Sequence, residues 1–235
     1  MMTMKTKLVF ALAAVLAAAP LLAAPAAKDE KKDAAAEQTD GPTPEQLKAR
    51  KTKKPSYTKF TDAKSMAAKC GLPLMVAALP ELSGPAAMGI NELKQKVLNN
   101  KDFMKDFAAQ NCVFAFMKIK PDSKNPKAVD TKSLKEPELK FIENFAVNKQ
   151  MIAKAKQQKQ DEPKYTDMAI YPIIICMDST CEKELFRLAK YDKDGGFGVW
   201  LSQVADMFRS AGIEPVLSPR VTKIVENPDE PKKWK

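Results

Sequence analysis

The sequence predicts an α/β domain, a three-layer sandwich in which helices cover both faces of a mixed central sheet. Three continuous apolar runs indicate buried strands, at Pro73–Leu79, Cys112–Ile119 and Ile170–Met177. Runs of roughly four to eight apolar residues are typical of strands that are covered on both faces. Amphipathic segments alternate with these runs, and that order is typical of α/β folds. A right-handed crossover makes the first two strands parallel neighbours.

The segments around the first strand indicate helices. Tyr57–Phe60 predicts a short opening strand, and Asp62–Cys70 predicts a helix that stops at Gly71. Asn91–Ala109 predicts an amphipathic helix or a pair of helices, because its apolar residues recur at helical spacing. The stretch between Ser83 and Asn111 is longer than one ordinary helix needs, so we expect an extra turn or a break at Gly89.

The second half of the chain predicts a helical insertion, a hairpin and a closing helix. The insertion spans 120–168, and Leu139–Lys159 is its expected long helix. Asp178-Ser179 predicts a two-residue turn that leads into a returning strand at Glu184–Leu188. Phe197–Phe208 then predicts a helix whose inner face carries Trp200, Leu201, Val204 and Phe208.

The ends of the chain differ in composition from this domain. Residues 1–26 are typical of a signal peptide, with Lys5 and Lys7 before an apolar stretch and small residues after it. The alternative, a membrane anchor, needs roughly 20 apolar residues, and this stretch is shorter. Residues 27–55 predict a flexible basic linker, with a short helix around Pro44–Arg50 as an element within it. Residues 56–216 predict the folded domain, and 217–235 a tail in which Val221, Ile224 and Val225 add at most a final strand or clasp.

Charge and residue usage exclude several classes of function. The net charge of +10 comes mostly from scattered lysines, with no basic stretch interleaved with aromatic residues, so we expect no nucleic-acid partner. The chain has no histidine, which removes the commonest general base and metal ligand. We expect no metal and no cofactor, and no integral membrane segment once the signal peptide is removed.

Three motifs resemble secreted bacterial proteins of the thioredoxin-like superfamily. Ala68–Leu74 resembles the entry to the first core strand, and Ser83-Gly84-Pro85-Ala86 stands where these proteins carry Cys-Gly-Pro-Cys. Tyr171-Pro172 resembles the cis-proline that precedes the third strand. The resemblance implies a thioredoxin-like fold, a degenerate active site and a location outside the cytoplasm, in the bacterial periplasm.

Loss of both motif cysteines argues against catalysis. Thioredoxin chemistry needs a thiolate at a helix N-terminus and a second, resolving thiol, whereas Ser83 offers only a weakly acidic hydroxyl. We therefore expect no catalytic residue, and a protein or peptide partner docked on Ser83, Gly84, Pro85, Ala86, Tyr171 and Pro172 by strand-like pairing. A purely structural role in the envelope is a further interpretation.

Four cysteines in an exported chain favour disulfides. If Asp178-Ser179 is a two-residue turn, Cys176 and Cys181 lie opposite one another, and a disulfide fits there. Cys70 and Cys112 lie at the starts of the two parallel strands and form the second candidate pair, with buried free thiols as the alternative. A relocated Cys176/Cys181 dithiol also defines the alternative function, a thiol-disulfide oxidoreductase.

Overall fold

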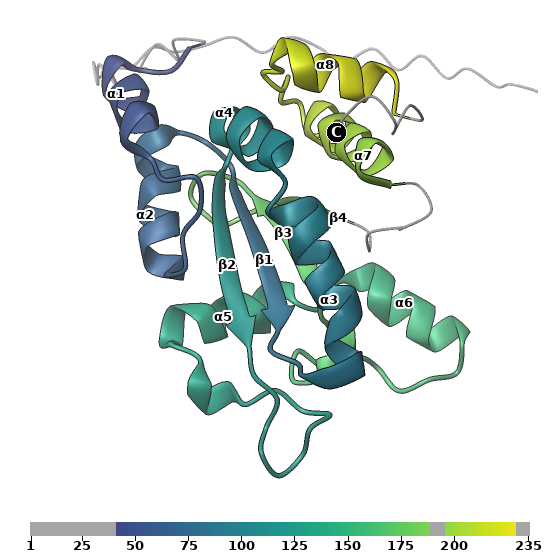
Figure 1. Cartoon of the computed structure of the whole chain (residues 1–235). Coiled ribbons are helices and arrows are strands. Elements are labelled where there is room, and N and C mark those ends of the chain that lie inside the picture. The colour runs from purple at the N-terminus through teal and green to yellow at the C-terminus, as the bar shows by residue number, and fades with distance from the viewer. Residues whose placement is uncertain (1–40, 189–195, 229–235) are drawn as a thin grey trace, which may run out of the picture. The chain divides into compact units, whose positions relative to one another are not determined.

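The computed structural model describes residues 41–188 and 196–228 (Figure 1). The expected signal peptide, residues 27–40 of the expected linker and the last residues of the expected tail lie outside these described residues. In the part of the chain that is described, no helix is long and apolar enough to cross a membrane.

A mixed four-stranded sheet in the order β2-β1-β3-β4 forms the middle layer. β1 (Leu74–Pro80) runs parallel to β2 (Val113–Ile119), with Leu74 opposite Val113. On its other side β1 pairs antiparallel with β3 (Ile173–Met177), which pairs antiparallel with β4 (Glu184–Leu188). This is the strand order and direction of the thioredoxin fold, so the predicted fold class is confirmed.

One face of the sheet is covered by α2 (Phe60–Cys70) and α5 (Glu136–Phe145). Alternate residues of β1, such as Leu74 and Val76, point into this layer because side chains alternate along a strand. The predicted stop of α2 is confirmed, since Gly71 adopts the left-handed conformation at φ +58° and its N–H bonds to the last turn. The predicted opening strand reduces to one parallel bridge between Tyr57 and Ala115.

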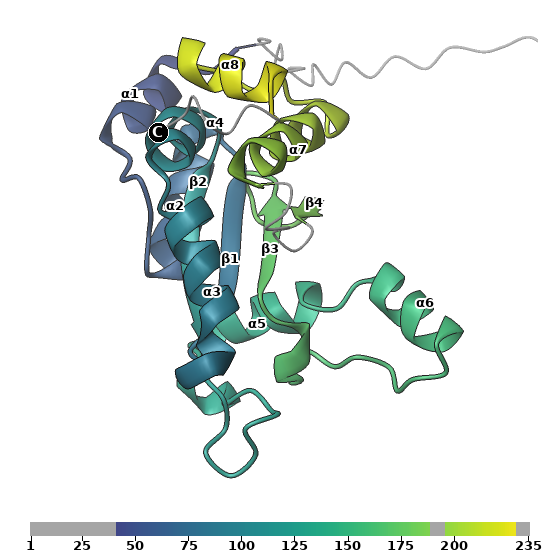
Figure 2. The same cartoon turned by 45° about the vertical axis from the view of Figure 1, so that its right-hand side comes forward.

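The opposite face is covered by the segment between β1 and β2 and by the last helices of the described chain (Figures 1 and 2). Its elements are α3 (Met88–Glu92), η2 (Leu93–Leu98), η3 (Asp102–Ala108), α4 (Ala109–Asn111), α7 (Gly196–Ser210) and α8 (Pro219–Glu226). The inner face predicted for α7 is confirmed, because Trp200, Leu201, Val204 and Phe208 are all buried there.

The long segment between β1 and β2 is a pair of helices, each with a π-helical part. η2 and η3 are wound with the wider i→i+5 pattern, as in the bond from Asn99 N to Lys94 O at 2.7 Å. The break lies at Asn99-Asn100 and not at Gly89, which is inside α3. Its cause is Asn100, whose side-chain oxygen accepts from the N–H of Asp102 at 2.8 Å and starts the second helix.

The predicted helical insertion is present, but its expected long helix is two helices. α5 ends at Phe145, and α6 (Lys149–Gln157) starts at an N-cap in which Asn148 Oδ1 accepts from Met151 N at 2.8 Å. Both views show α6 extending away from the sheet (Figures 1 and 2). Two short 3₁₀ turns, η4 (Thr131–Ser133) and η5 (Met168–Ile170), complete the insertion.

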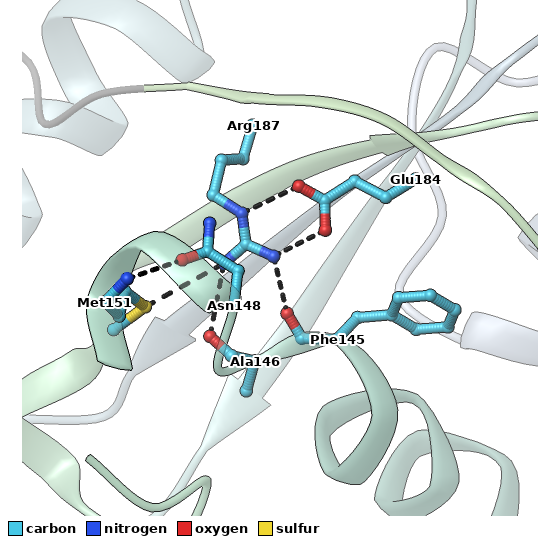
Figure 3. Close-up of polar contacts among 6 residues, drawn as sticks. All are labelled: Phe145, Ala146, Asn148, Met151, Glu184 and Arg187. Atoms are coloured by element: carbon cyan, nitrogen blue, oxygen red, sulfur yellow. Dashed lines mark hydrogen bonds and ion pairs between the residues drawn. The ribbon is translucent and has the colours of Figure 1, made fainter. Parts of the chain in front are cut away.

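Arg187 of β4 holds the break between these two helices (Figure 3). Its guanidinium donates to the carbonyl of Phe145 at 2.8 Å and to that of Ala146 at 3.2 Å. Glu184 binds the same guanidinium with both carboxylate oxygens, at 2.8 and 2.5 Å. The cation therefore satisfies carbonyls at the C-terminal end of α5, where a positive charge is favoured.

From residue 41 onward the expected linker is not flexible, and the short helix expected around Pro44–Arg50 is present. α1 (Pro44–Thr52) begins at a capping box between Thr43 and Gln46 and packs on α2. Arg50 donates to the carbonyl of Cys70 at 3.0 Å, so the helix is attached to the domain. Just after it, Lys53 Nζ donates to the carbonyls of Cys112 at 2.6 Å and Ala108 at 3.1 Å.

The expected boundary at residue 216 is also wrong, because α8 belongs to the domain. Ser218 caps the helix by accepting from Val221 N, and Val221 and Ile224 are fully buried against the neighbouring helices. Arg220 binds the buried Asp102 with Nε–Oδ1 at 2.7 Å and Nη2–Oδ2 at 3.2 Å. A helix with two buried residues, and not a strand or a loose tail, therefore closes this layer.

Candidate functional site

The structure brings the two predicted parts of the site to one end of the sheet. Ser83–Ala86 follows the carboxyl end of β1, and Tyr171-Pro172 precedes the start of β3. β1 and β3 are antiparallel with Ala78 opposite Ile173, so the end of one strand lies beside the start of the other. The sequence prediction that these two segments share one surface is consistent with this register.

Between β1 and α3 the chain makes a tight turn with an exposed apolar rim. Ser83 and Gly84 are exposed, and Gly84 has a φ of +63°, a conformation that glycine adopts at little cost. η1 (Gly84–Ala87) follows and leads into α3. Leu82 is 37% exposed and Met88 is 70% exposed, so an apolar side chain faces solvent on each side of the motif.

A surface ion pair borders this turn. The Glu81 backbone N–H donates to Ile119 O at 2.8 Å, and its carboxylate lies 2.9 Å from Lys118 Nζ. The hydrogen bond from Lys118 lowers the pKa of Glu81. Glu81 is therefore ionised at neutral pH and is tied to β2, not directed at the start of the following helix.

Tyr171 is turned into the protein. The bond between Tyr171 and Pro172 is cis. The phenol of Tyr171 is buried and donates to Tyr165 O at 2.8 Å, and burial raises its pKa well above the ordinary value. Its backbone N–H donates to Met168 O at 3.2 Å. A partner at this edge therefore meets Pro172, which is half-buried, and not the Tyr171 ring.

The predicted pairing of Cys176 with Cys181 is wrong. Cys176 lies opposite Phe186, and Met177 lies opposite Glu184, so the connection between the strands is longer than two residues. Asp178 organises this loop by accepting from the N–H groups of Glu182 and Lys183. As a result Cys176 faces the layer of α7, whereas Cys181 packs on the face covered by α2 and α5.

The predicted pairing of Cys70 with Cys112 is wrong for a related reason. Cys70 is the last residue of α2 and packs in the layer of α2 and α5, whereas Cys112 packs on the opposite face. All four cysteines are buried free thiols. Cys112 and Cys176 pack on the same face, but Cys112 directly precedes β2 and Cys176 is in β3, with β1 between these two strands. That places them about two strand spacings, roughly 9–10 Å, apart, beyond disulfide reach.

The surroundings of the thiols keep them protonated. Burial raises the pKa of Cys112 to about 12 and that of Cys181 to about 11, and it raises that of Cys176 well above the ordinary value. Burial also raises the pKa of Cys70, although Lys53 and Arg50 oppose the shift. Because the thiolate is the reactive form, none of these groups has the character of a redox nucleophile.

The exposed pair Leu82 and Met88 was missed by reasoning from sequence. The available signal was one large apolar residue on each side of Ser83–Ala86, in a turn that otherwise contains small residues. Among the described residues, no three His, Cys, Asp or Glu side chains gather as a metal site. The arrangement offers an apolar, thiol-free contact surface at one edge of the sheet.

No family model matches this chain, and no curated protein matches it. A solved structure titled "DsbH Oxidoreductase" aligns with 67% of this chain and 87% of its own chain, at 13% sequence identity and a TM-score of 0.40. A likeness this distant says nothing about activity. The chain's own strand order assigns it to the thioredoxin-like fold.

Proposed function

We propose that this chain is a thioredoxin-like protein without dithiol chemistry that binds a polypeptide at the edge formed by Ser83–Ala86 and Pro172. The observation that carries the proposal is the exposed apolar pair, Leu82 and Met88, around a motif that holds Ser83 and Ala86 where thioredoxins hold cysteines. Exposed apolar side chains beside a strand end suit contact with an extended or unfolded chain.

Binding to a permanently unfolded, carboxymethylated polypeptide tests this proposal. The label is a fluorophore on the polypeptide, and the readout is fluorescence anisotropy. We expect Met88→Asp and Leu82→Asp each to weaken binding about tenfold, since loss of an apolar anchor at the centre of an interface costs more than about 1 kcal/mol. Val216→Asp is the matched control, because Val216 is 60% exposed and belongs to a different surface.

Two results count against the proposal. One is equal weakening by all three aspartate variants, which would indicate a general charge effect. The other is no measurable binding by the unsubstituted protein.

The alternative, an oxidoreductase that uses Cys176 and Cys181, has no support in the geometry, because these thiols lie on opposite faces of the sheet. It predicts reduction of insulin by the protein and loss of that activity in Cys181→Ser. Thiols with raised pKa values predict no reduction by either form.

We also propose that the chain is exported and works in the bacterial periplasm. The support is the order of charges and apolar residues in 1–26, with a small-residue segment at Ala23–Ala27. Determining the N-terminal residue of the protein isolated from cells tests this. A new N-terminus near Ala26 supports export, and an intact Met1 in the cytoplasmic fraction contradicts it.

A further inference from the structure

A cavity of about 390 Å³ opens between α2 and α5. Its floor is a row of phenyl rings. The ring centroids of Phe60 and Phe141 are 5.1 Å apart, and those of Phe141 and Phe145 are 5.5 Å apart. Cys181, from the loop between β3 and β4, closes one side. The cavity therefore has a continuous aromatic surface drawn from two helices.

The spacing of residues along α5 builds the two walls of this cavity. Residues four apart stack along one side of a helix, and α5 carries two such rows side by side. Pro137, Phe141 and Phe145 form the apolar row, and Glu136, Lys140 and Asn144 form the polar row. α2 adds Phe60 and, one turn later, Lys64. The apolar residues line the floor and the polar ones the rim.

The rim carries an excess of positive charge. Lys140 is already paired with Glu136 at 2.6 Å, so this pair contributes no net charge. Lys64 forms no ion pair with any described residue, and its ammonium lies near enough to Cys181 to oppose the rise in that thiol's pKa. Among the described residues that line the cavity, Lys64 is therefore the charged group without an ion-pair partner, and the carboxylate of Asp178, which is not part of the lining, acts on Cys181 in the opposite sense.

We propose that this cavity binds a small amphipathic carboxylate, with its hydrocarbon part on Phe60, Phe141 and Phe145 and its carboxylate on Lys64. The volume lies within the roughly 300–1,000 Å³ of ligand pockets, and an apolar pocket with a few placed polar groups is the common design of such sites. Removing apolar ligand surface from water drives binding, and Lys64, the unpaired cation among the described lining residues, favours a monoanion.

This site is separate from the surface proposed for polypeptide binding. Cys181 follows the carboxyl end of β3, whereas Pro172 precedes its amino end. None of the residues that line the cavity belongs to the motif Ser83–Ala86 or to the exposed pair Leu82 and Met88, and the cavity lies on the face of the sheet that α2 and α5 cover. Either proposal can therefore fail without the other.

Three phenylalkyl probes of one shape and different charge test the inference: 4-phenylbutyrate, 4-phenylbutan-1-ol and 4-phenylbutylamine. Each is titrated into the ¹⁵N-labelled protein, and the dissociation constant is taken from amide shifts. We expect the shifts to centre on Lys64, Asn144 and Cys181. We expect the carboxylate to bind about two- to fivefold more tightly than the alcohol, the range of a partly exposed ion pair, and the amine to bind most weakly.

Two variants and one matched control locate the site. Lys64→Gln should remove the preference for the carboxylate over the alcohol and leave alcohol binding unchanged. Lys69→Gln, also an exposed lysine of α2 but outside this cavity, removes the same charge from the protein and should leave all three affinities unchanged. Asn144→Trp, at an exposed position on the rim, should fill the cavity and weaken all three probes, with circular dichroism confirming the fold.

Three outcomes overturn the inference. They are amine binding as tight as carboxylate binding, equal effects of the two glutamine variants, and failure of 4-phenylbutyrate at millimolar concentration to shift the amides that line the cavity.

Discussion

Asn111 joins two segments of the chain that are far apart in sequence. Its side chain is buried, and its amide donates to Phe107 O and to Val216 O, both at 2.9 Å. Its carbonyl oxygen accepts from Val216 N at 2.7 Å. One amide therefore satisfies both backbone groups of Val216 and holds the segment that leads into α8.

Asn111→Ala should lower the free energy of unfolding by about 2–3 kcal/mol. The substitution removes the three hydrogen bonds made by the buried Asn111 side chain, and a typical intramolecular hydrogen bond contributes about 0.5–1.5 kcal/mol. Urea unfolding followed by circular dichroism measures the change. The neighbouring, exposed Gln110→Ala is the control and should stay within about 0.5 kcal/mol; equal effects of the two substitutions would contradict this role for Asn111.

The Cys112 thiol predicts a loss of stability in alkaline solution. Its pKa is raised from 9.0 to about 12 in the folded protein, so above pH 9 the unfolded chain releases this proton and the folded one keeps it. The folded state then binds more protons, and stability falls as pH rises from about 9 toward 12.

Comparison of the unsubstituted protein with Cys112→Ala isolates this effect. The difference in unfolding free energy between them should be constant up to about pH 8.5. It should then shrink by about 1.4 kcal/mol for each further pH unit, as measured by urea unfolding from pH 7 to 10.5. Parallel curves across that range would exclude a raised pKa for Cys112.

At the scale of elements, the insertion is attached to the sheet by Arg187. This side chain is 17% exposed and joins β4 to the C-terminal carbonyls of α5 and to Glu184. Figure 2 shows that α6 leaves the body of the domain. Arg187 bonds to the backbone just before α6, so we infer that these bonds, and not packing of α6 on the sheet, fix the direction of this helix.

Arg187→Ala should cost about 1.5–3 kcal/mol of stability, the range for hydrogen bonds to charged groups. It should also speed hydrogen exchange of the amides in Lys149–Gln157 relative to those in β1. Arg209→Ala is the matched control, because Arg209 is 39% exposed and its ion pairs with Asp206 and Glu214 are on the surface. Unchanged exchange in α6 would show that Arg187 does not hold the insertion.

β1, β2 and β3 could be predicted from sequence because each is a short apolar run, and β4 because it returns after a predicted turn. The shared edge of Ser83 and Pro172 follows from the strand order.

A short helix around Pro44–Arg50 could be predicted, but its packing on the domain could not, because its composition is polar. The apolar residues Val221 and Ile224 indicated a final strand or a clasp, and the structure forms a helix there. The signals were present, as Thr43 with Gln46 forms a capping box and Ser218 precedes Pro219 at a helix start. The pairing of Cys176 with Cys181 depended on the length of one loop, and that of Cys70 with Cys112 on the face of the sheet against which each residue packs. Composition specifies neither.

At the scale of the whole molecule, the sheet divides the interior into two layers and places two thiols in each. Cys70 and Cys181 pack on one face, and Cys112 and Cys176 on the other. The fold is therefore held by packing and hydrogen bonds, with no covalent link among these four residues.

The unfolding midpoint in urea should be the same with and without dithiothreitol. A disulfide between any two of the cysteines would contribute about 2–4 kcal/mol and would make the midpoint fall on reduction. Mass spectrometry after alkylation of the unfolded protein should find four modified cysteines in both samples. A lower midpoint under reducing conditions would mean that a disulfide forms in solution.

The separation of the thiols also decides how the protein responds to oxidative damage. Cys181 borders a cavity between α2 and α5. It lies against Phe60 and Lys64 in the first turns of α2, whereas Cys70 ends that helix, about 9 Å further along at 1.5 Å per residue. A sulfenic acid formed by peroxide at Cys181 would have no neighbouring thiol to condense with. Its repair would depend on a small thiol or a reductase from outside the molecule, and without one the side chain would proceed to the irreversible sulfinic acid.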